Sequence, residues 1–163
     1  MKHLYVIRHA KSSWADEGMR DFDRPLNERG KKNAPMMAER LVAKSKVDHF
    51  VVSPAKRTRQ TAQHFTTAFS FPENKIQWEE SIYEAPVTAL INVVEQLDDK
   101  FDNVAFIGHN YGVSLLVAYL TGESVQMPTC AIATIELEIE SWKLISREIG
   151  RLIDYDFPKK MTE

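Results

Sequence analysis

Three short apolar runs, each followed at once by basic or histidine residues and then by a helix-forming stretch, constrain the fold of this chain most strongly. The runs cover residues 4–7, 49–52 and 103–107. They are too short to be helices and have no alternating polar face, as is typical of buried strands in parallel sheets. Strands that alternate with helices in this way predict an α/β fold, in which helices cover both faces of a mostly parallel central sheet in three layers.

The stretches between these runs have helical periodicity. The first helix is expected to begin after Asn27, which offers a side-chain cap, and to continue to about residue 44, with Pro35 marking either a kink or the true start. The second helix is expected to have Ser53 as its cap and Pro54 at its first helical position. Two further helices are expected over residues 87–97 and 113–120.

The remaining segments carry weaker periodic signals. Residues 10–25 are polar and irregular, and loops of this length in compact domains often have a function. A short edge strand is expected over residues 76–78, and a strand over residues 131–139 with a hairpin partner at 142–145. The tail from Arg151 is charged and contains a proline, so we expect either an ordered strap or a frayed end.

Composition narrows the class of protein. The chain has 163 residues, a formal net charge of −2 and one cysteine, Cys130. Its length predicts a single domain over residues 1–163, and its charge gives no general attraction to nucleic acid or to an anionic membrane. One cysteine cannot form an internal disulfide, and the chain shows neither a signal peptide nor an apolar run of membrane-spanning length. We therefore expect a cytoplasmic protein with a buried, inert Cys130.

The predicted sheet brings the carboxyl ends of its strands to one edge, where ligands bind in open α/β folds. Arg8 and His9 follow the first strand, residues 53–57 the second and residues 108–110 the third. Metal binding is disfavoured because the arginines would repel a cation and no third ligand is evident. A tetrahedral dianion suits this set better, since arginine pairs with phosphate oxygens through two donors and the start of a helix adds backbone donors.

Three motifs in these segments resemble those of the histidine phosphatase superfamily, which includes cofactor-dependent phosphoglycerate mutase. They are RHA at residues 8–10, SPAKRTRQTA at 53–62 and GHN at 108–110, and they occur in the order of that family. Each motif is weakly specific by itself, but the three together are a strong signal.

The short length of the chain and three further segments are similar to the SixA-type phosphohistidine phosphatases within that superfamily. The segments are RHAKSSW at residues 8–14, DRPLNERG at 23–30 and DYDFP at 154–158. The resemblance implies a phosphoglycerate mutase-like α/β fold, no metal or other cofactor, and a covalent phosphohistidine intermediate.

The resemblance also implies roles for individual residues. His9 would be the nucleophile, and Arg8, Arg57 and His109 would form the phosphate pocket, with Arg24 as a further substrate-contacting arginine. Electrostatics supports the role of His9 as nucleophile, because the charges of Arg8 and Arg57 should lower its pKa and keep it unprotonated near pH 7. His109 can donate a hydrogen bond to the phosphoryl oxygens.

Departures from the family pattern bear on the substrate. The family usually has a glycine after the nucleophile, whereas this chain has Ala10, whose methyl group takes up little extra space in the site. Lys11 and Ser12 stand where the mutases carry a glutamate and an asparagine, and the chain has no room for the long insertions that close over a sugar phosphate. An open site favours a phosphate on a protein surface, with Lys11, Ser12 and Asn110 as candidate substrate-binding residues.

The general acid is less well defined. Glu84 lies near the position where larger members of the superfamily have a glutamate, and Asp16 in the loop is the alternative. If the substrate is phosphohistidine, the acid matters less, because neutral imidazole, whose conjugate acid has a pKa of about 6.5, leaves far more readily than a serine alkoxide.

The sequence therefore predicts a metal-independent phosphatase that releases inorganic phosphate, with phosphohistidine on a signalling or carrier protein as the favoured substrate. A small-molecule phosphomonoesterase with the same site is the nearest alternative. A phosphate-recognising module without turnover is the alternative from another class, and the intact set of nucleophile and phosphate ligands argues against it.

Overall fold

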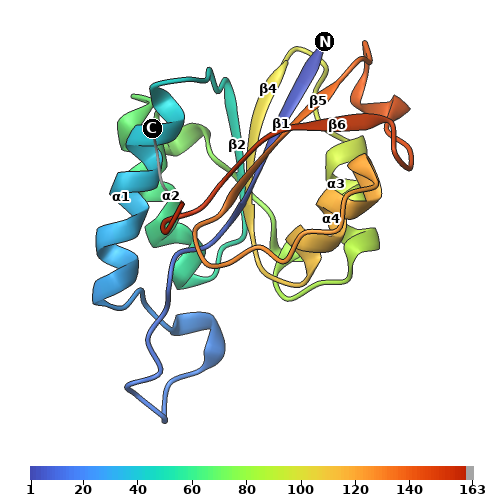
Figure 1. Ribbon diagram of the computed structural model, residues 1–163. Helices are drawn as coiled ribbons and strands as arrows, with labels where there is room; N and C mark the ends of the chain where they lie inside the picture. The colour runs from blue at the N-terminus through green and yellow to red at the C-terminus, as the bar shows by residue number, and fades with distance from the viewer. Residues whose placement is uncertain (161–163) are drawn as a thin grey trace.

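A six-stranded mixed sheet is the central feature of the computed structural model, which describes residues 1–160 (Figure 1). The strands are β1 (Lys2–Arg8), β2 (His49–Val52), β3 (Gln77–Trp78), β4 (Asn103–Gly108), β5 (Ile132–Leu137) and β6 (Gly150–Asp156), in the order β3-β2-β4-β1-β5-β6. β3, β2, β4 and β1 pair in parallel, whereas β5 and β6 are antiparallel to their neighbours. The predicted α/β class with a mostly parallel sheet is confirmed.

Helices cover both faces of this sheet, which confirms the predicted three layers. α1 (Glu28–Val42) and α2 (Lys56–Ala68) lie on one face, and α3 (Val87–Glu95) and α4 (Gly112–Thr121) on the other (Figure 1). Alternate side chains of β1 enter different cores: Leu4 and Val6 pack towards α3 and α4, whereas Tyr5 and Ile7 pack towards α1 and α2. Because both faces are apolar, β1 needs no polar face. Within residues 1–160, none of the helices combines the length and the apolar character that crossing a membrane requires.

The starts of the first two helices differ in how well the sequence predicts them. Asn27 caps α1 as predicted, and its side chain accepts a 2.9 Å hydrogen bond from the amide of Gly30. Pro35 lies well inside α1 and is therefore not its start. The predicted cap at Ser53 is wrong, because α2 begins at Lys56. The Ser53 side chain instead contacts a ring nitrogen of His109 at 2.8 Å.

The predicted hairpin at residues 142–145 is also wrong. These residues form a short 3-10 turn that begins at Trp142. The Trp142 side chain is fully buried, and its backbone amide donates to the Asp99 side chain at 2.9 Å and not to a neighbouring strand. The antiparallel partner of β5 is β6, which lies in the predicted tail. β6 is also held to α1 by an ion pair of 3.0 Å between Arg40 and Asp156. The last part of the predicted tail, residues 161–163, lies outside the described residues.

The start of α1 packs tightly against the loop that follows β1. The amide of Asn27 donates to the carbonyl oxygen of Lys11 at 3.0 Å, and Ser12 forms an isolated antiparallel bridge with Leu26. A Cβ at Gly30 would clash with that same carbonyl oxygen and lie 3.1 Å from the Lys11 amide nitrogen. Glycine at position 30 therefore allows the two backbones to approach each other.

We predict that Gly30→Ala destabilises the protein by about 1–3 kcal/mol, the usual cost of overpacking, measured as the free energy of unfolding in urea. Helix propensity alone would give the opposite sign, a gain of roughly 0.5–1 kcal/mol. Gly18→Ala is the matched control, because its Cβ would meet nothing closer than a carboxylate oxygen of Asp16 at 3.5 Å. A stabilised Gly30→Ala protein would contradict this account of the contact.

Candidate active site

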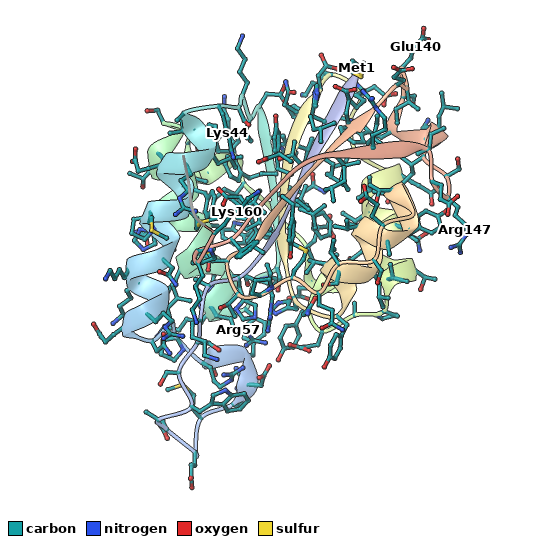
Figure 2. The ribbon with its side chains drawn as sticks, in the orientation of Figure 1. Met1, Lys44, Arg57, Glu140, Arg147 and Lys160 are labelled. Atoms are coloured by element: carbon teal, nitrogen blue, oxygen red, sulfur yellow. The ribbon has the colours of Figure 1, made fainter. Side chains whose placement is uncertain are left out.

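Three strand ends bring the predicted site residues to one edge of the sheet. His9 follows β1, and its amide donates to the carbonyl oxygen of Gly108 in β4 at 3.1 Å. The amide of Ser53, just after β2, donates to the carbonyl oxygen of Ile107 at 3.2 Å. Arg57 lies in the first turn of α2, and Figure 2 shows it at the lower edge of the sheet, above the blue loop after β1.

A small pocket of about 160 Å³ lies at this edge. It is lined by Arg8, His9, Lys11, Ser12, Trp14, Arg24, Arg57, Glu84, Asn110 and Thr129. His109 is buried beside the pocket, and the centre of its ring lies 5.3 Å from that of His9. The structure thus brings together all nine residues that the sequence suggested for catalysis or substrate binding. Asp16, the alternative acid, does not line the pocket.

The hydrogen bonding of His9 defines its reactive nitrogen. Nδ1 lies 2.7 Å from the carbonyl oxygen of Ala10, which can only accept, so Nδ1 carries the proton and Nε2 keeps its lone pair. Burial, together with the positive charges of Arg57, Arg8 and Arg24, lowers the pKa of His9 to about 3 against the opposing bond to Ala10. His9 is therefore a neutral imidazole near pH 7, and its Nε2 can act as a nucleophile.

Three buried donors near His9 have no hydrogen-bond partner among residues 1–160. They are Nε of Arg8, Nε of Arg57 and Nδ1 of His109. Each arginine uses another nitrogen for a backbone carbonyl: Arg8 donates to Met127 at 2.9 Å and Arg57 to Asp21 at 2.8 Å. Because buried donors in proteins are normally paired, three unpaired donors around one nucleophile indicate a ligand with several acceptor oxygens.

Ser53 orients the second histidine. Its Oγ lies 2.8 Å from Nε2 of His109 and accepts a 3.4 Å hydrogen bond from the amide of Ala55. The hydroxyl hydrogen can then be donated to Nε2, which leaves the imidazole proton on Nδ1. Burial, together with His9 and the charge of Arg57, lowers the pKa of His109 to about 3 against the opposing charge of Asp21. A neutral His109 with its proton on Nδ1 can donate to a phosphoryl oxygen.

Two carboxylates hold the fully buried guanidinium of Arg57. Its Nη2 lies 3.0 Å from Oδ2 of Asp21 and 2.7 Å from Oε1 of Glu84. Burial by itself would raise the pKa of Asp21, but the hydrogen bond from Tyr83 and the charge of Arg57 outweigh it and lower this pKa to about 2. Glu84, the predicted acid, is half exposed, and its Oε1 lies 3.6 Å from Nδ1 of His109.

No sequence motif marks Asp21 or Tyr83 as a site residue. The one local signal for Asp21 is its position three residues before Arg24, to which it is ion-paired at 3.1 Å. Its contacts with Arg57 and with Tyr83, at 2.5 Å from the Tyr83 hydroxyl, join segments far apart in the chain. No sequence pattern reports such contacts.

Arg24 connects the loop after β1 to the pocket. It donates to Oγ of Ser12 at 2.8 Å, so the Ser12 side chain positions this arginine. The exposed ring of Trp14 lies over the Arg24 guanidinium, with 3.5 Å between the guanidinium carbon and the ring centre. Asn110 is held differently: its Oδ1 accepts from Ser114 at 2.5 Å, which leaves its amide hydrogens available.

This arrangement can bind a phosphoryl group and attack it. Nε2 of His9 keeps a lone pair that can attack phosphorus, and the N–H donors of Arg8, Arg57 and His109 that lack partners can bind phosphoryl oxygens. Among residues 1–160, no group of three or more histidine, cysteine, aspartate or glutamate side chains is placed to hold a metal ion.

Comparisons with known proteins agree with this chemistry. The family model for the histidine phosphatase superfamily (branch 1) matches residues 4–90. An uncharacterized chloroplastic protein of Arabidopsis thaliana is 29% identical over 151 residues, which cover 87% of this chain and 69% of that protein.

Among solved structures, the candidate phosphohistidine phosphatase SixA of Agrobacterium tumefaciens is 28% identical with a TM-score of 0.80, covering 96% of this chain and 98% of that one. The protein histidine phosphatase SixA complexed with tungstate has a TM-score of 0.82 at 23% identity, covering 96% and 97%, and shows the shared fold. Because the family model spans more than half of the chain and the Agrobacterium tumefaciens structure is similar over 96% of it, this protein belongs to branch 1 of the histidine phosphatase superfamily and is of the SixA type.

Proposed function

We propose that this protein is a metal-independent phosphatase that forms a covalent phosphohistidine on His9, with phosphohistidine on a signalling or carrier protein as its favoured substrate. Membership in the superfamily supports phosphatase activity. The observation that carries the proposal is the neutral Nε2 of His9 surrounded by three buried donors that have no partner among residues 1–160.

The first chemical step transfers the phosphoryl group to the protein. Nε2 of His9 attacks phosphorus, a P–N bond forms, and the bond to the leaving group breaks with its electron pair going to the leaving atom. A phosphohistidine whose other ring nitrogen carries a proton leaves as neutral imidazole. Arg8, Arg57 and His109 stabilise the charge on the phosphoryl oxygens as they donate hydrogen bonds.

The second step regenerates the protein. A water molecule attacks the phosphorus of phospho-His9, the P–N bond breaks, and its electron pair returns to Nε2 as inorganic phosphate is released. The bond from Nδ1 to Ala10 supports this step, because it holds the ring in one orientation throughout the cycle.

The exposed rim of the pocket supports a protein substrate. Lys11 and Trp14 are exposed at the rim, and the pocket itself is small, so only the phosphoryl group needs to enter it. The similarity to the candidate phosphohistidine phosphatase of Agrobacterium tumefaciens points to the same substrate class. Small phosphate esters would meet the same donors, so a comparison of substrates must separate the two activities.

We predict that the wild-type protein, mixed with a ³²P-labelled phosphohistidine peptide and quenched with denaturant, retains label on the protein. His9→Ala should retain no label and release no phosphate, because it lacks the attacking nitrogen. His64→Ala is the matched control and should behave as wild type, since His64 lies in α2 and does not line the pocket. Label on His9→Ala would exclude His9 as the nucleophile, and a wild type that binds phosphate without turnover would indicate a recognition module.

We predict that His9 and His109 remain neutral from about pH 5 to about pH 8 in the free protein. A pKa lowered from 6.5 to about 3 means that the uncharged form persists as the pH falls through the usual titration range. Long-range ¹⁵N–¹H correlation spectra of the imidazole nitrogens measure this, with His9→Gln and His109→Gln to assign the signals. Titration of either ring near pH 6.5, or a proton on Nε2 of His9, would contradict the proposed geometry.

We predict that Glu84→Gln slows hydrolysis of an aryl phosphate on the order of a hundredfold, the low end for loss of a general acid, but slows phosphohistidine hydrolysis by less than about tenfold. The difference arises because imidazole needs less help to leave than an oxygen anion. Asp16→Asn is the control and should change neither rate, since Asp16 does not line the pocket. Equal losses on both substrates would refute the leaving-group argument.

A further inference from the structure

A second and larger hollow lies next to the phosphate pocket. It has a volume of about 640 Å³ and is bounded by the start of α1, by Pro128 and Thr129 before β5, and by the segment after β6. Figure 1 shows that segment, in dark red, returning towards α1. Pro128, Phe157 and Pro158 give this groove an apolar floor. Its volume is in the range of cavities that hold several side chains or a small ligand.

The groove adjoins the active site. Thr129 lines both the groove and the phosphate pocket. On the other side, the start of α1 is held against Lys11 by the bond from Asn27, and Lys11 itself lines the phosphate pocket. A chain lying in the groove would therefore lead directly to the mouth of the pocket that holds His9.

The rim of the groove is positively charged. Arg29, Lys32 and Lys159 are exposed there, and none of the three forms an ion pair with another side chain of residues 1–160. Among residues 1–160, Glu28 is the one carboxylate that lines the groove, and its Oε1 lies 3.6 Å from Nζ of Lys31. Because the whole chain has a net charge of −2, this cluster is a local concentration of positive charge and not a consequence of composition.

We infer that the groove binds an acidic, partly apolar polypeptide segment that flanks the phosphorylated residue of the protein substrate. This inference rests on the proposed function and adds the chemistry of the partner. Acidic side chains would pair with Arg29, Lys32 and Lys159, and apolar side chains would cover Phe157 and the two prolines. A nucleic acid would satisfy the cations, but its phosphates would leave the apolar floor uncovered.

The test uses two synthetic phosphohistidine peptides of equal length, one with glutamate and leucine beside the phosphohistidine and one with glutamine and serine there. The wild type should hydrolyse the acidic peptide with a kcat/KM about tenfold higher, and this preference should shrink as salt is added. The variant Arg29→Glu/Lys32→Glu should lose the preference and keep its rate on an aryl phosphate, which needs only the phosphate pocket.

The matched control is Lys143→Glu/Arg147→Glu, which makes the same change in charge elsewhere. Figure 2 shows Arg147 on the side of the molecule opposite α1. This control should keep the wild-type preference. Equal hydrolysis of the two peptides by the wild type, or a preference that survives in Arg29→Glu/Lys32→Glu, would overturn the inference.

A binding measurement separates this inference from the proposed function. The unphosphorylated acidic peptide, carrying a fluorescent label, should bind the wild type more tightly than the neutral peptide does and should lose affinity for Arg29→Glu/Lys32→Glu, as read by fluorescence anisotropy. If no phosphohistidine peptide is hydrolysed but this pattern of binding is observed, the proposed substrate is wrong, and the groove is still confirmed as a binding site for acidic peptides. If the acidic peptide binds no better than the neutral one, or less tightly than a labelled single-stranded oligonucleotide, the groove has been misassigned.

Discussion

The buried guanidinium of Arg57 is the group on which the rest of the site depends. A permanent charge taken out of water costs several kcal/mol unless it is paired and hydrogen-bonded. Arg57 is 1% exposed, and its partners are Asp21 in the loop after β1 and Glu84 in the turn before α3. Asp21 begins a one-turn 3-10 helix (Asp21–Asp23), and Glu84 lies in a turn, so neither belongs to a strand or to one of the four long helices. The charge of Arg57 therefore holds these two connecting segments in place around His9, while its Nε has no partner among residues 1–160.

The sheet provides what these loops cannot, a fixed separation between the two histidines. β1 and β4 are neighbouring parallel strands, and the amide of His9 continues their ladder by donating to Gly108, the residue before His109. Side-chain bonds then set each imidazole, through the carbonyl of Ala10 for His9 and through Ser53 for His109. These bonds orient both rings before any ligand arrives, and burial, which lowers their pKa values, keeps both rings neutral. Binding therefore incurs little additional cost of ordering them.

The sequence predicted those features that short-range patterns encode. Apolar runs located the strands of the parallel half, and Asn27 located the start of α1, because burial and capping act within a few residues. The meeting of Arg8, His9 and residues 53–57 and 108–110 followed from the rule that parallel strands end at one edge. The features that the sequence did not predict depend on distant contacts. β6 pairs with β5, while Trp142 is buried in the connection between them. Ser53 contacts His109 instead of capping α2, and Asp21 pairs with Arg57.

Under the proposed function, selectivity for one phosphorylated protein would come from outside the phosphate pocket. Arg8, Arg57 and His109 would bind phosphoryl oxygens, which every phosphate ester and phosphohistidine share, so these contacts would not separate substrates that differ elsewhere. The net charge of −2 would weakly repel an acidic partner, but charges further apart than about 8 Å are largely screened at physiological ionic strength. Arg29, Lys32 and Lys159 act inside that distance on a chain already in the groove. For the acidic segment proposed above, attraction at the rim would therefore outweigh repulsion from the rest of the surface, and the groove beside the pocket would select the substrate.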